Sequence, residues 1–313
     1  MTRSQQDRWG GRRYYSLDSC LRETFGEKVY KITLNGGMSC PNRDGHIGTG
    51  GCIFCSAMGS GDFAGDAALS ITEQLARGKK ELLEKRPVHS YIAYFQAFTN
   101  THAPVSYLEK IFMEAIQDPD VKALSVATRP DCLGGDVLEL LERLNRIKPV
   151  WIELGLQTIH EESSRFIRRG YRLETFDKAV CDLRRIGVTV IVHVILFLPG
   201  ETEEMMLETV EHLNRRDIQG IKLQLLHVLE GTDLAGFYRD HPFHVPDMEE
   251  YIRVLGRCVS RLRPDIVIHR LTGDGPKDLL IAPLWTGAKR TLLNRMHQYL
   301  KENDIWQGKE YHG

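Results

Sequence analysis

Three cysteines near the start of the chain have a spacing that could hold a metal centre. Cys40, Cys52 and Cys55 follow an apolar run at residues 29–34 that is typical of a β-strand, and the aromatic Phe54 directly precedes the last cysteine. Three thiolates on one loop can bind three corners of a cubic iron–sulfur cluster and leave the fourth iron open. The C-x11-C-x2-C pattern therefore predicts a [4Fe–4S] cluster with one iron free to bind a cofactor.

A zinc site, with His46 as its fourth ligand, is the alternative that these cysteines leave open. Structural zinc sites usually show two close pairs of ligands. Here there is one close pair, one distant cysteine and a glycine-rich spacer, so we favour iron–sulfur over zinc. The other cysteines are scattered singly and are interpreted as ordinary buried thiols: Cys20, Cys132, Cys181 and Cys258.

Length, charge and hydropathy narrow the class of protein. A chain of 313 residues with 42% apolar residues suits one large domain, and α/β barrels often have this size. The formal net charge of -1 gives no global signal for nucleic acid. No apolar stretch approaches the roughly 20 residues of a membrane span, and the polar N-terminus lacks the apolar region of a secretory signal. We expect a cytoplasmic protein with no membrane partner.

Strand-type and helix-type segments alternate after the cysteine loop, which implies parallel strands joined by right-handed crossovers. About six or seven such units fit a partial or full α/β barrel better than a flat doubly wound sheet, although periodicity alone does not decide between them. The fold that we expect is a partial TIM-type (β/α)6 barrel of class α/β. Its expected parts are an N-terminal extension at 1–28, a core at 29–270 and a C-terminal helical extension at 271–313. The expected strands are residues 29–34, 91–95, 123–127, 150–154, 188–196, 221–226 and a last one beginning at 266. The expected helices are about 70–85, 107–116, 136–147, 173–186, 202–214 and 247–262.

The residues that follow these strands are unusually polar, and the C-terminal ends of barrel strands are where such folds carry their chemistry. They are Gln96, Thr99 and Asn100, residues 128–131, Gln157 and Thr158, residues 199–201, and His227 with Glu230.

Together these segments resemble the radical S-adenosylmethionine (SAM) superfamily. The resemblance rests on the cysteine motif and on residues 128–131 (TRPD), 153–158 (ELGLQT), 169–171 (RGY) and 198–200 (LPG). They are similar to the radical SAM core of the elongator-complex catalytic subunit. Residues 270–277 and 282–285 further resemble a bacterial subfamily of stand-alone proteins associated with tRNA wobble-uridine modification. The eleven-residue gap departs from the commonest C-x3-C-x2-C spacing. Residues 271–313 are too few for the acetyltransferase domain of elongator-like enzymes, so we do not expect that activity.

The resemblance implies a [4Fe–4S] cluster on the three cysteines, with SAM bound to the open iron. One electron would split SAM into methionine and a 5′-deoxyadenosyl radical, which takes a hydrogen atom from the substrate. The cofactor supplies this chemistry and the protein positions it. The implied substrate is a tRNA whose wobble-uridine side chain is altered, and the implied electron donor is a flavodoxin or ferredoxin.

The same resemblance assigns the expected SAM contacts by position. Gln96, Thr99 and Asn100 stand where the family binds the methionine amino group, and Arg129 can pair with the SAM carboxylate. The other expected contacts are Glu153, Gln157, Arg165, His193 and Pro199. Structural interpretations stay open for several of them. Arg129 could cap a turn, Glu153 could be a barrel residue, His193 a satisfied core histidine and Pro199 part of a turn.

Two arginine-rich segments could contact RNA. One carries Arg165, Arg168, Arg169, Arg172, Arg184 and Arg185, and the other interleaves Arg3, Arg8, Arg12 and Arg13 with Trp9, Tyr14 and Tyr15. They could equally be a solvated helix face and a disordered lead-in. Two rival functions therefore remain. The first is radical chemistry on a small metabolite, which the missing positive charge favours, and the second is a zinc-binding protein without catalysis.

Overall fold

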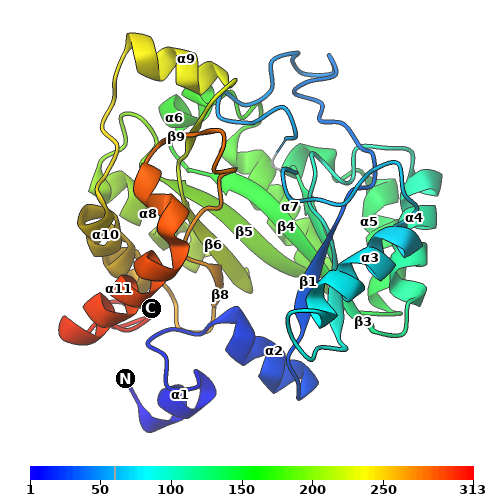
Figure 1. Ribbon diagram of the computed structural model, residues 1–313, viewed down its shortest axis with the longest axis horizontal. Coiled ribbons are helices and arrows are strands. Elements are labelled where there is room, and N and C mark those ends of the chain that lie inside the picture. The colour runs from blue at the N-terminus through cyan, green and yellow to red at the C-terminus, as the bar shows by residue number, and fades with distance from the viewer. Residues whose placement is uncertain (60) are drawn as a thin grey trace.

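The computed structural model describes residues 1–59 and 61–313. Its centre is one parallel sheet of seven strands in the order β1-β2-β3-β4-β5-β6-β8. The sheet curls into a half-barrel with helices on its outer side (Figure 1). The predicted partial α/β barrel is confirmed. The strands are β1 Tyr30–Leu34, β2 Tyr91–Phe95, β3 Val121–Thr128, β4 Val150–Gln157, β5 Thr189–Leu196, β6 Gly220–Leu225 and β8 Val267–Arg270.

The helices alternate with these strands as the sequence pattern predicts. Apolar residues at helical spacing bury one face of each: α4, for example, buries Leu108, Ile111 and Phe112 against the sheet. The helices are α1 Arg3–Arg8, α2 Leu17–Phe25, α3 Ile71–Leu83, α4 Val105–Gln117, α5 Gly135–Asn145, α6 Glu161–Phe166, α7 Leu173–Arg185, α8 Glu203–Asn214, α9 Asp233–Asp240, α10 Met248–Arg261 and α11 Lys289–Glu302. Short 3-10 turns lie at Pro130–Cys132 and Leu284–Ala288.

The strands are buried on both faces, as is usual for parallel sheets covered by helices. All five residues of β2 are buried, and β5 leaves only Thr189 and His193 partly exposed. Alternate residues of each strand point into the half-barrel because side chains along a strand alternate between its faces. A polar residue at such a position therefore lies inside the barrel, which decides where the site can form.

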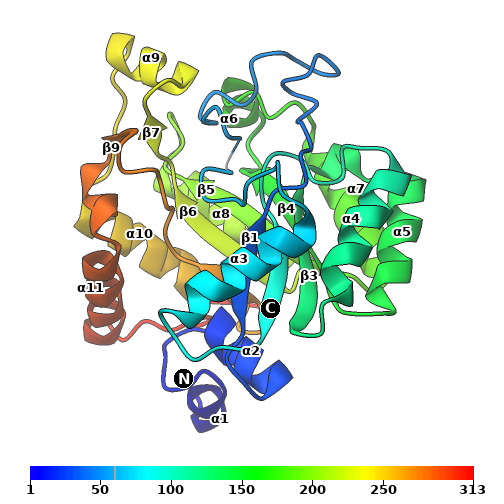
Figure 2. The same ribbon diagram turned by 45° about the vertical axis from the view of Figure 1, so that its right-hand side comes forward.

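The N-terminal segment is ordered and closes the lower end of the barrel (Figure 2). Leu21 of α2 packs with Ile92, Ala123 and Trp151 from inside the sheet. Trp9 and Tyr15 are 1% and 3% exposed and pack against Val267. The segment is thus not a disordered lead-in, and Tyr14 is buried too. These aromatic rings are core residues, so the base-stacking part of the RNA interpretation is wrong, whereas contacts of the arginines with RNA phosphates stay a prediction.

The two edge strands, β1 and β8, do not pair with each other, so the barrel stays open along one side. Beyond this opening β7, Val228–Leu229, pairs in antiparallel fashion with β9, Leu280–Ala282. Helix α11, which follows β9 in the chain, packs on α10. Within the described residues, no helix combines the length and the apolar character needed to cross a bilayer.

Candidate functional site

One backbone hydrogen bond closes the base of the cysteine loop. The amide of Gly51 donates to the carbonyl of Asn42 over 2.7 Å. Measured across this bond, only residues 41, 42 and 51 separate Cys40 from Cys52. The loop therefore has a base with three residues between the two cysteines, as in a C-x3-C motif. Residues 43–50 project from this base, and we call them the excursion. The eleven-residue gap between Cys40 and Cys52 is therefore bridged at its base by the contact between Asn42 and Gly51.

Cys40, Cys52 and Cys55 line one cavity of about 190 Å³ at the C-terminal ends of the strands. Their sulfur atoms do not all lie within 4.8 Å of one another. Thiolates on a single zinc ion, with Zn–S bonds of about 2.3 Å, would be about 3.8 Å apart. The three thiols together are thus too widely spaced for one zinc ion, although Cys52 and Cys55 share a hydrogen bond, and this spacing suits a cluster in which each thiolate binds its own iron.

The electrostatic setting favours the thiolate at one of these cysteines. A hydrogen bond from Cys55 and the nearby guanidinium of Arg129 lower the pKa of Cys52 to about 7. The same pairing, together with burial, raises the pKa of Cys55. Thiolates are the form that binds metal, so the residues present fit the iron–sulfur group that the spacing predicts.

Side chains fix the loop from both sides. The guanidinium of Arg43 donates to the carbonyls of Cys55 and Ser56 over 3.1 and 2.6 Å. The amide of Asn42 donates to the carbonyl of Arg168 over 2.6 Å, which ties the loop to the segment after α6. Ile53 packs into a second apolar cluster between α6 and α9. The three cysteines are thus presented on a braced loop.

Most of the SAM contacts expected from the sequence come together around this cavity. Its lining includes Gln96, Thr99, Arg129, Glu153, Gln157 and His193. Three expected residues are not in this lining. Asn100 is fully buried, and its amide donates to the carbonyls of Phe95 and Ala127 at the end of β2. Pro199 is half-buried in the turn after β5.

Arg165 needs a correction, because the structure places its side chain on the surface. It is 75% exposed and lies 4.0 Å from Glu161, one turn earlier on α6. Helical spacing aims it away from the strand ends, and the short α6 could not be placed by periodicity alone. Arg165 is therefore a solvated helix residue and does not face the cavity.

Gln157 carries an unsatisfied polar atom in the cavity wall. Its Oε1 is buried and has no hydrogen-bond partner among the described residues. Its backbone has φ 68°, a left-handed conformation at the end of β4 that is costly for a residue other than glycine. Buried polar atoms without partners are rare in proteins, and one in a cavity fits a ligand that donates a hydrogen bond.

Arg129 lines the cavity but is already engaged. Its Nε and Nη2 donate to the two carboxylate oxygens of Asp131 over 2.9 and 2.8 Å. Its guanidinium lies 4.8 Å from the centre of the Tyr171 ring. Burial opposes the charge, but Asp131 outweighs it and raises the pKa of Arg129. Nη1 takes no part in the bonds to Asp131, so both the structural and the SAM-binding interpretation remain compatible with this geometry.

Glu153 stands at the centre of a buried polar network that we call the Glu153 cage. Its side chain is fully buried and forms ion pairs with Lys31 and Lys222. It also accepts from Ser125 over 2.9 Å and lies 2.7 Å from Nε2 of His193. The cage joins residues from five strands at one level of the barrel interior.

Burial and charge oppose each other in the cage. Burial alone would raise the pKa of Glu153, but Lys222, Lys31 and His193 hold it well below its usual range. Burial lowers the pKa of Lys222 to about 7 although Glu153 opposes this shift. Burial and the charge of Lys222 lower the pKa of His193 to about 4. His193 is thus a neutral partner of a carboxylate that two lysines neutralise.

The sequence analysis missed both lysines of the cage. Lys31 and Lys222 are lone charges in otherwise apolar strands, which is the signal that could have identified them. Their ammonium groups lie 4.4 and 4.8 Å from the centre of the Tyr94 ring. Together with Arg270, which also lines the cavity, they give the barrel interior an excess of positive charge.

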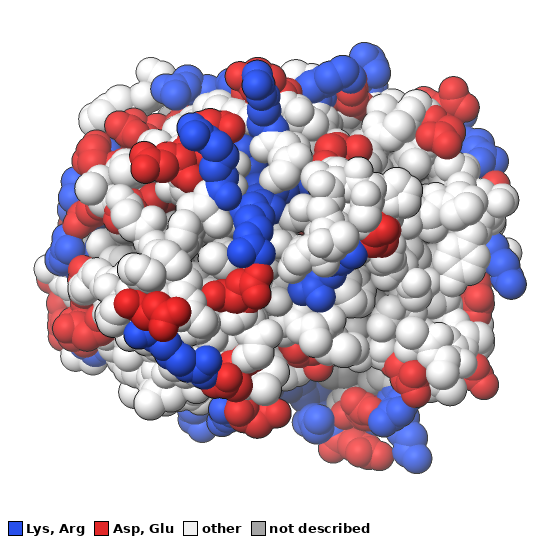
Figure 3. All heavy atoms as spheres, turned by 90° about the horizontal axis from the view of Figure 1, so that it is seen from above, with Lys and Arg blue, Asp and Glu red and all other residues white. Residues whose placement is uncertain are grey.

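The cavity continues toward the open side of the barrel. A space of about 640 Å³ beside it also contacts Gln96, Gln224 and Arg270 and reaches Lys277 and Lys289. Seen from above, Lys and Arg side chains form a strip that runs from the upper edge to the centre of the molecule, with Asp and Glu side chains beside and below it (Figure 3). This is the face that the strand ends and the cysteine loop form in Figure 1. A large or negatively charged substrate could therefore reach the cysteines along this side.

The arginine-rich segment after β4 does not form the basic patch that the sequence suggested. Arg169 is 1% exposed and donates to the carbonyls of Leu156 and Thr158. The exposed arginines are divided among separate ion pairs: Arg168 with Asp233, Arg184 with Asp217, and Arg185 with Asp182. The cavity of the cysteines is lined instead by Arg129, Lys222 and Arg270, among other residues.

Comparison with known families decides what kind of site this is. Residues 43–213 match the Radical SAM superfamily, and residues 218–302 match the Radical_SAM C-terminal domain. The chain belongs to the radical SAM superfamily. YtqA of Bacillus subtilis is 42% identical to this radical SAM protein over 298 residues, which cover 95% of the chain and 92% of YtqA. Membership confirms the predicted cofactors, a [4Fe–4S] cluster and SAM.

The elongator-like resemblance is confirmed as well. A protein of Methanocaldococcus jannaschii named tRNA uridine(34) acetyltransferase is 26% identical over 187 residues, which cover 58% of this chain and 33% of that protein. The solved structure of Methanocaldococcus infernus Elp3 has a TM-score of 0.69 at 16% identity, and the match covers 89% of this chain and 64% of that one. At this identity the structure shows a shared fold.

Proposed function

We propose that this radical SAM protein alters the side chain of a wobble uridine in tRNA. The observation that carries the proposal is the cavity in which three cysteines meet a positively charged barrel interior that opens to one side. Relatives named for tRNA uridine(34) acetylation share the radical SAM part of the chain, which supports a uridine as the substrate.

Each wall of the cavity has a distinct task in this proposal. Cys40, Cys52 and Cys55 hold the cluster, while Thr99, Arg129 and the free Oε1 of Gln157 orient SAM. When bound, these cofactors supply a carbon-centred radical that takes a hydrogen atom from the substrate. The protein excludes water and oxygen and fixes the distance between the reacting atoms.

Lys222 and Arg270 face the substrate from the far side of the same cavity. The positive charge of Arg270 suits the negative charge of a nucleic acid, whose phosphates dominate its affinity for proteins, whereas Lys222 is paired with Glu153. A base that is held in an anticodon loop must be turned out of its stack to reach such depth. The open side between β1 and β8 provides the entry.

Radical chemistry on a small metabolite is the second candidate function. The division of the exposed arginines among ion pairs favours it, because little unpaired positive charge is left on that surface for RNA. For either substrate we propose a cytoplasmic enzyme that receives its electron from a flavodoxin or ferredoxin.

Anaerobically reconstituted protein tests the chemistry first. Electron paramagnetic resonance of the reduced cluster should change when SAM is added, and chromatography should detect 5′-deoxyadenosine. A cluster that does not respond to SAM would contradict the assignment of the three cysteines.

The substrate needs a separate test. Bulk tRNA should bind the protein at low salt, and its affinity should fall as salt rises, because phosphate contacts release counterions. Wobble nucleosides of tRNA from a strain without the gene should differ by mass from those of the parent strain. Unchanged nucleosides together with no tRNA binding would favour the small metabolite, while the radical SAM assignment would stand.

A further inference from the structure

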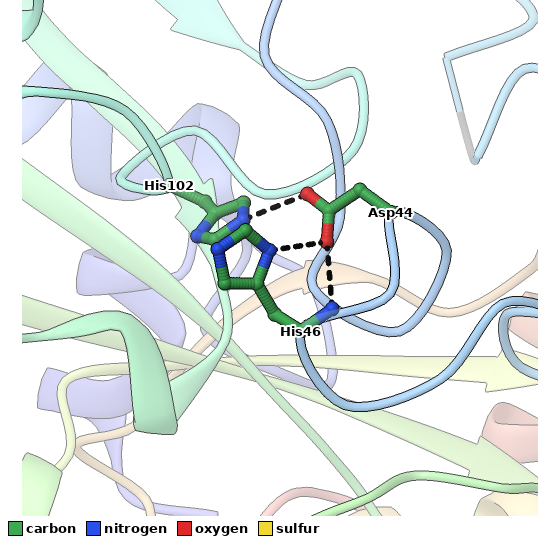
Figure 4. A group of neighbouring side chains, drawn as sticks. All are labelled: Asp44, His46 and His102. Carbon is green, nitrogen blue, oxygen red and sulfur yellow. Dashed lines mark hydrogen bonds and ion pairs between the residues drawn. The ribbon is translucent and has the colours of Figure 1, made fainter.

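The excursion at residues 43–50 brings together a second group of metal-ligand side chains. Asp44 and His46 lie on the excursion, and His102 lies between β2 and α4. One potential ligand atom from each of the three residues lies within 4.8 Å of the others. The three side chains converge from two separate segments of the chain (Figure 4). None of them lines the cavity of the cysteines.

Both imidazoles aim a ring nitrogen at the same carboxylate. Nδ1 of His46 lies 2.7 Å from Oδ1 of Asp44, and Nε2 of His102 lies 2.8 Å from Oδ2. The two rings are perpendicular, with their centres 4.9 Å apart. The nitrogens therefore approach from different directions, as ligands on one face of a coordination sphere do. Ser39 donates a further hydrogen bond to Asp44 over 2.5 Å and helps to fix its orientation.

The surroundings leave space for water ligands. A groove of about 660 Å³ borders all three residues. The side chain of His46 is 69% exposed, whereas those of Asp44 and His102 are 24% and 22% exposed. Three protein ligands with open positions are typical of zinc sites that retain water, and two histidines with one carboxylate suit divalent first-row metals in general.

The potential ligand atoms of Asp44, His46 and His102 differ in chemistry from those of the cluster site. The cluster takes three thiolates, whereas this group offers two imidazole nitrogens and a carboxylate oxygen. A shared carboxylate with two histidines can also be a simple hydrogen-bonded clamp. Convergence of both rings on one carboxylate beside an open groove is the arrangement that a metal ion would use.

We propose that Asp44, His46 and His102 form a site for one divalent metal ion, with zinc as its preferred occupant. The ion joins the excursion of the cysteine loop to the segment that carries Thr99. It therefore braces the loop whose thiols face the cavity. The proposal does not depend on the substrate of the enzyme.

Zinc binding to the reconstituted holoprotein tests the site. Loosely held metal is first removed with a chelator, and zinc chloride is then titrated against a competing chromophore. We expect one zinc ion per chain in addition to the cluster iron. His46→Ala and His102→Ala should each weaken zinc binding at least about 100-fold, since losing a ligand costs more than losing an outer partner.

His244→Ala is the matched control. His244 is 67% exposed and lies 2.8 and 3.0 Å from the carboxylate oxygens of Glu250, but no second histidine joins the pair. This variant should bind zinc as the parent does. Iron content and circular dichroism of each variant show whether the fold and the cluster persist, and the exposed His46 can be removed without loss of packing.

A variant that lacks all three cluster cysteines completes the test. It should still bind one zinc ion, and cobalt in its place should give no thiolate-to-cobalt absorption. The proposal is overturned if the holoprotein binds no zinc, if the histidine variants bind as the parent does, or if zinc binding disappears with the cysteines.

Discussion

The cysteine loop and the Glu153 cage line one cavity, but their reactive groups differ in how many partners the protein itself provides. The loop is braced through its backbone, by Gly51 to Asn42 and by Arg43 to Cys55, and it leaves its thiols facing the cavity. The cage surrounds its carboxylate with four partners from within the protein. We infer that the loop is built to receive a group and that the cage is built to hold the barrel together. Mutations should separate these roles.

The largest expected effect is on activity at the loop. Cys55→Ala should reduce SAM cleavage to background, because only two thiolates remain to hold the cluster, which is then not retained in its active form. The unfolding temperature of the protein without its cluster should change little. Chromatographic detection of 5′-deoxyadenosine and iron analysis measure the first effect, and circular dichroism measures the second.

Cys132→Ala is the control for this variant. Cys132 is half-buried and burial raises its pKa to about 12, but its thiol does not line the cavity. The Cys132→Ala variant should therefore keep both the cluster and the cleavage of SAM. SAM cleavage by the Cys55 variant would show that the ligands are assigned wrongly.

The next effect is on stability in the cage. Glu153→Gln should lower the free energy of unfolding by about 3–5 kcal/mol, because it leaves Lys222 and Lys31 buried without their counter-ion. Denaturant midpoints measure this loss. Glu201→Gln is the matched control, since Glu201 is half-buried, accepts a hydrogen bond from Thr158 over 2.5 Å and has its pKa raised by burial. An equal loss of unfolding free energy in both variants would contradict the proposal that the cage holds the barrel together.

Lowering the pH should reduce the difference in unfolding free energy between the parent and Glu153→Gln. The pKa of Glu153 is lowered in the folded state, so its ion pairs stabilise the protein above the unfolded value of 4.5, and this contribution is lost as the pH falls toward the folded pKa. The gap in unfolding free energy between the parent and Glu153→Gln should therefore shrink below about pH 4.5, and it should also shrink as the pH rises toward about 7, because Lys222 then loses its proton. A gap that widens in acid would show that the folded carboxyl is protonated more readily than an unfolded one.

The two regions also differ in how much of them could be predicted. The cysteine motif is local, so residue types and spacing predict it, and the alternation of strands and helices predicts a parallel α/β fold. The family resemblance was needed to choose the partial barrel. The cage depends on which face of each strand points inward. Strands such as β6 are buried on both faces, so alternation is hidden and Lys222 gives no pattern with its neighbours. The closure of the loop by Gly51 could not be predicted either, because it depends on backbone hydrogen bonds, such as those from Gly51 to Asn42 and from Ile47 to Pro41, that leave no pattern in the sequence.

Arg129 lies between the two regions and should show an intermediate effect. If it binds the SAM carboxylate, Arg129→Ala should weaken SAM binding about 10- to 100-fold, the usual value of one or two hydrogen bonds between charged groups. The cluster should persist. Equilibrium dialysis against SAM gives the affinity, and the absorption of the cluster gives its content.

Asp131→Asn distinguishes this role from a structural one. It weakens the bidentate pair but leaves the guanidinium in the cavity wall. If Arg129 binds SAM, the asparagine variant should keep most of the affinity. If Arg129 only fixes the turn at Pro130–Cys132, both variants should lose affinity and stability to the same degree.

The smallest effect concerns the closure of the loop. Gly51 has φ 72°, and a Cβ there would lie 2.7 Å from Nε of Arg43, whereas Gly45 has φ 94° and would meet nothing within 4 Å. Alanine at either position costs about 1–3 kcal/mol of backbone strain. Only Gly51→Ala should also displace Arg43 from the carbonyls of Cys55 and Ser56. We therefore expect Gly51→Ala to lose iron to a chelator several times faster than Gly45→Ala, at similar stability. Equal rates would mean that the backbone closure, without Arg43, is enough to hold the thiols in place.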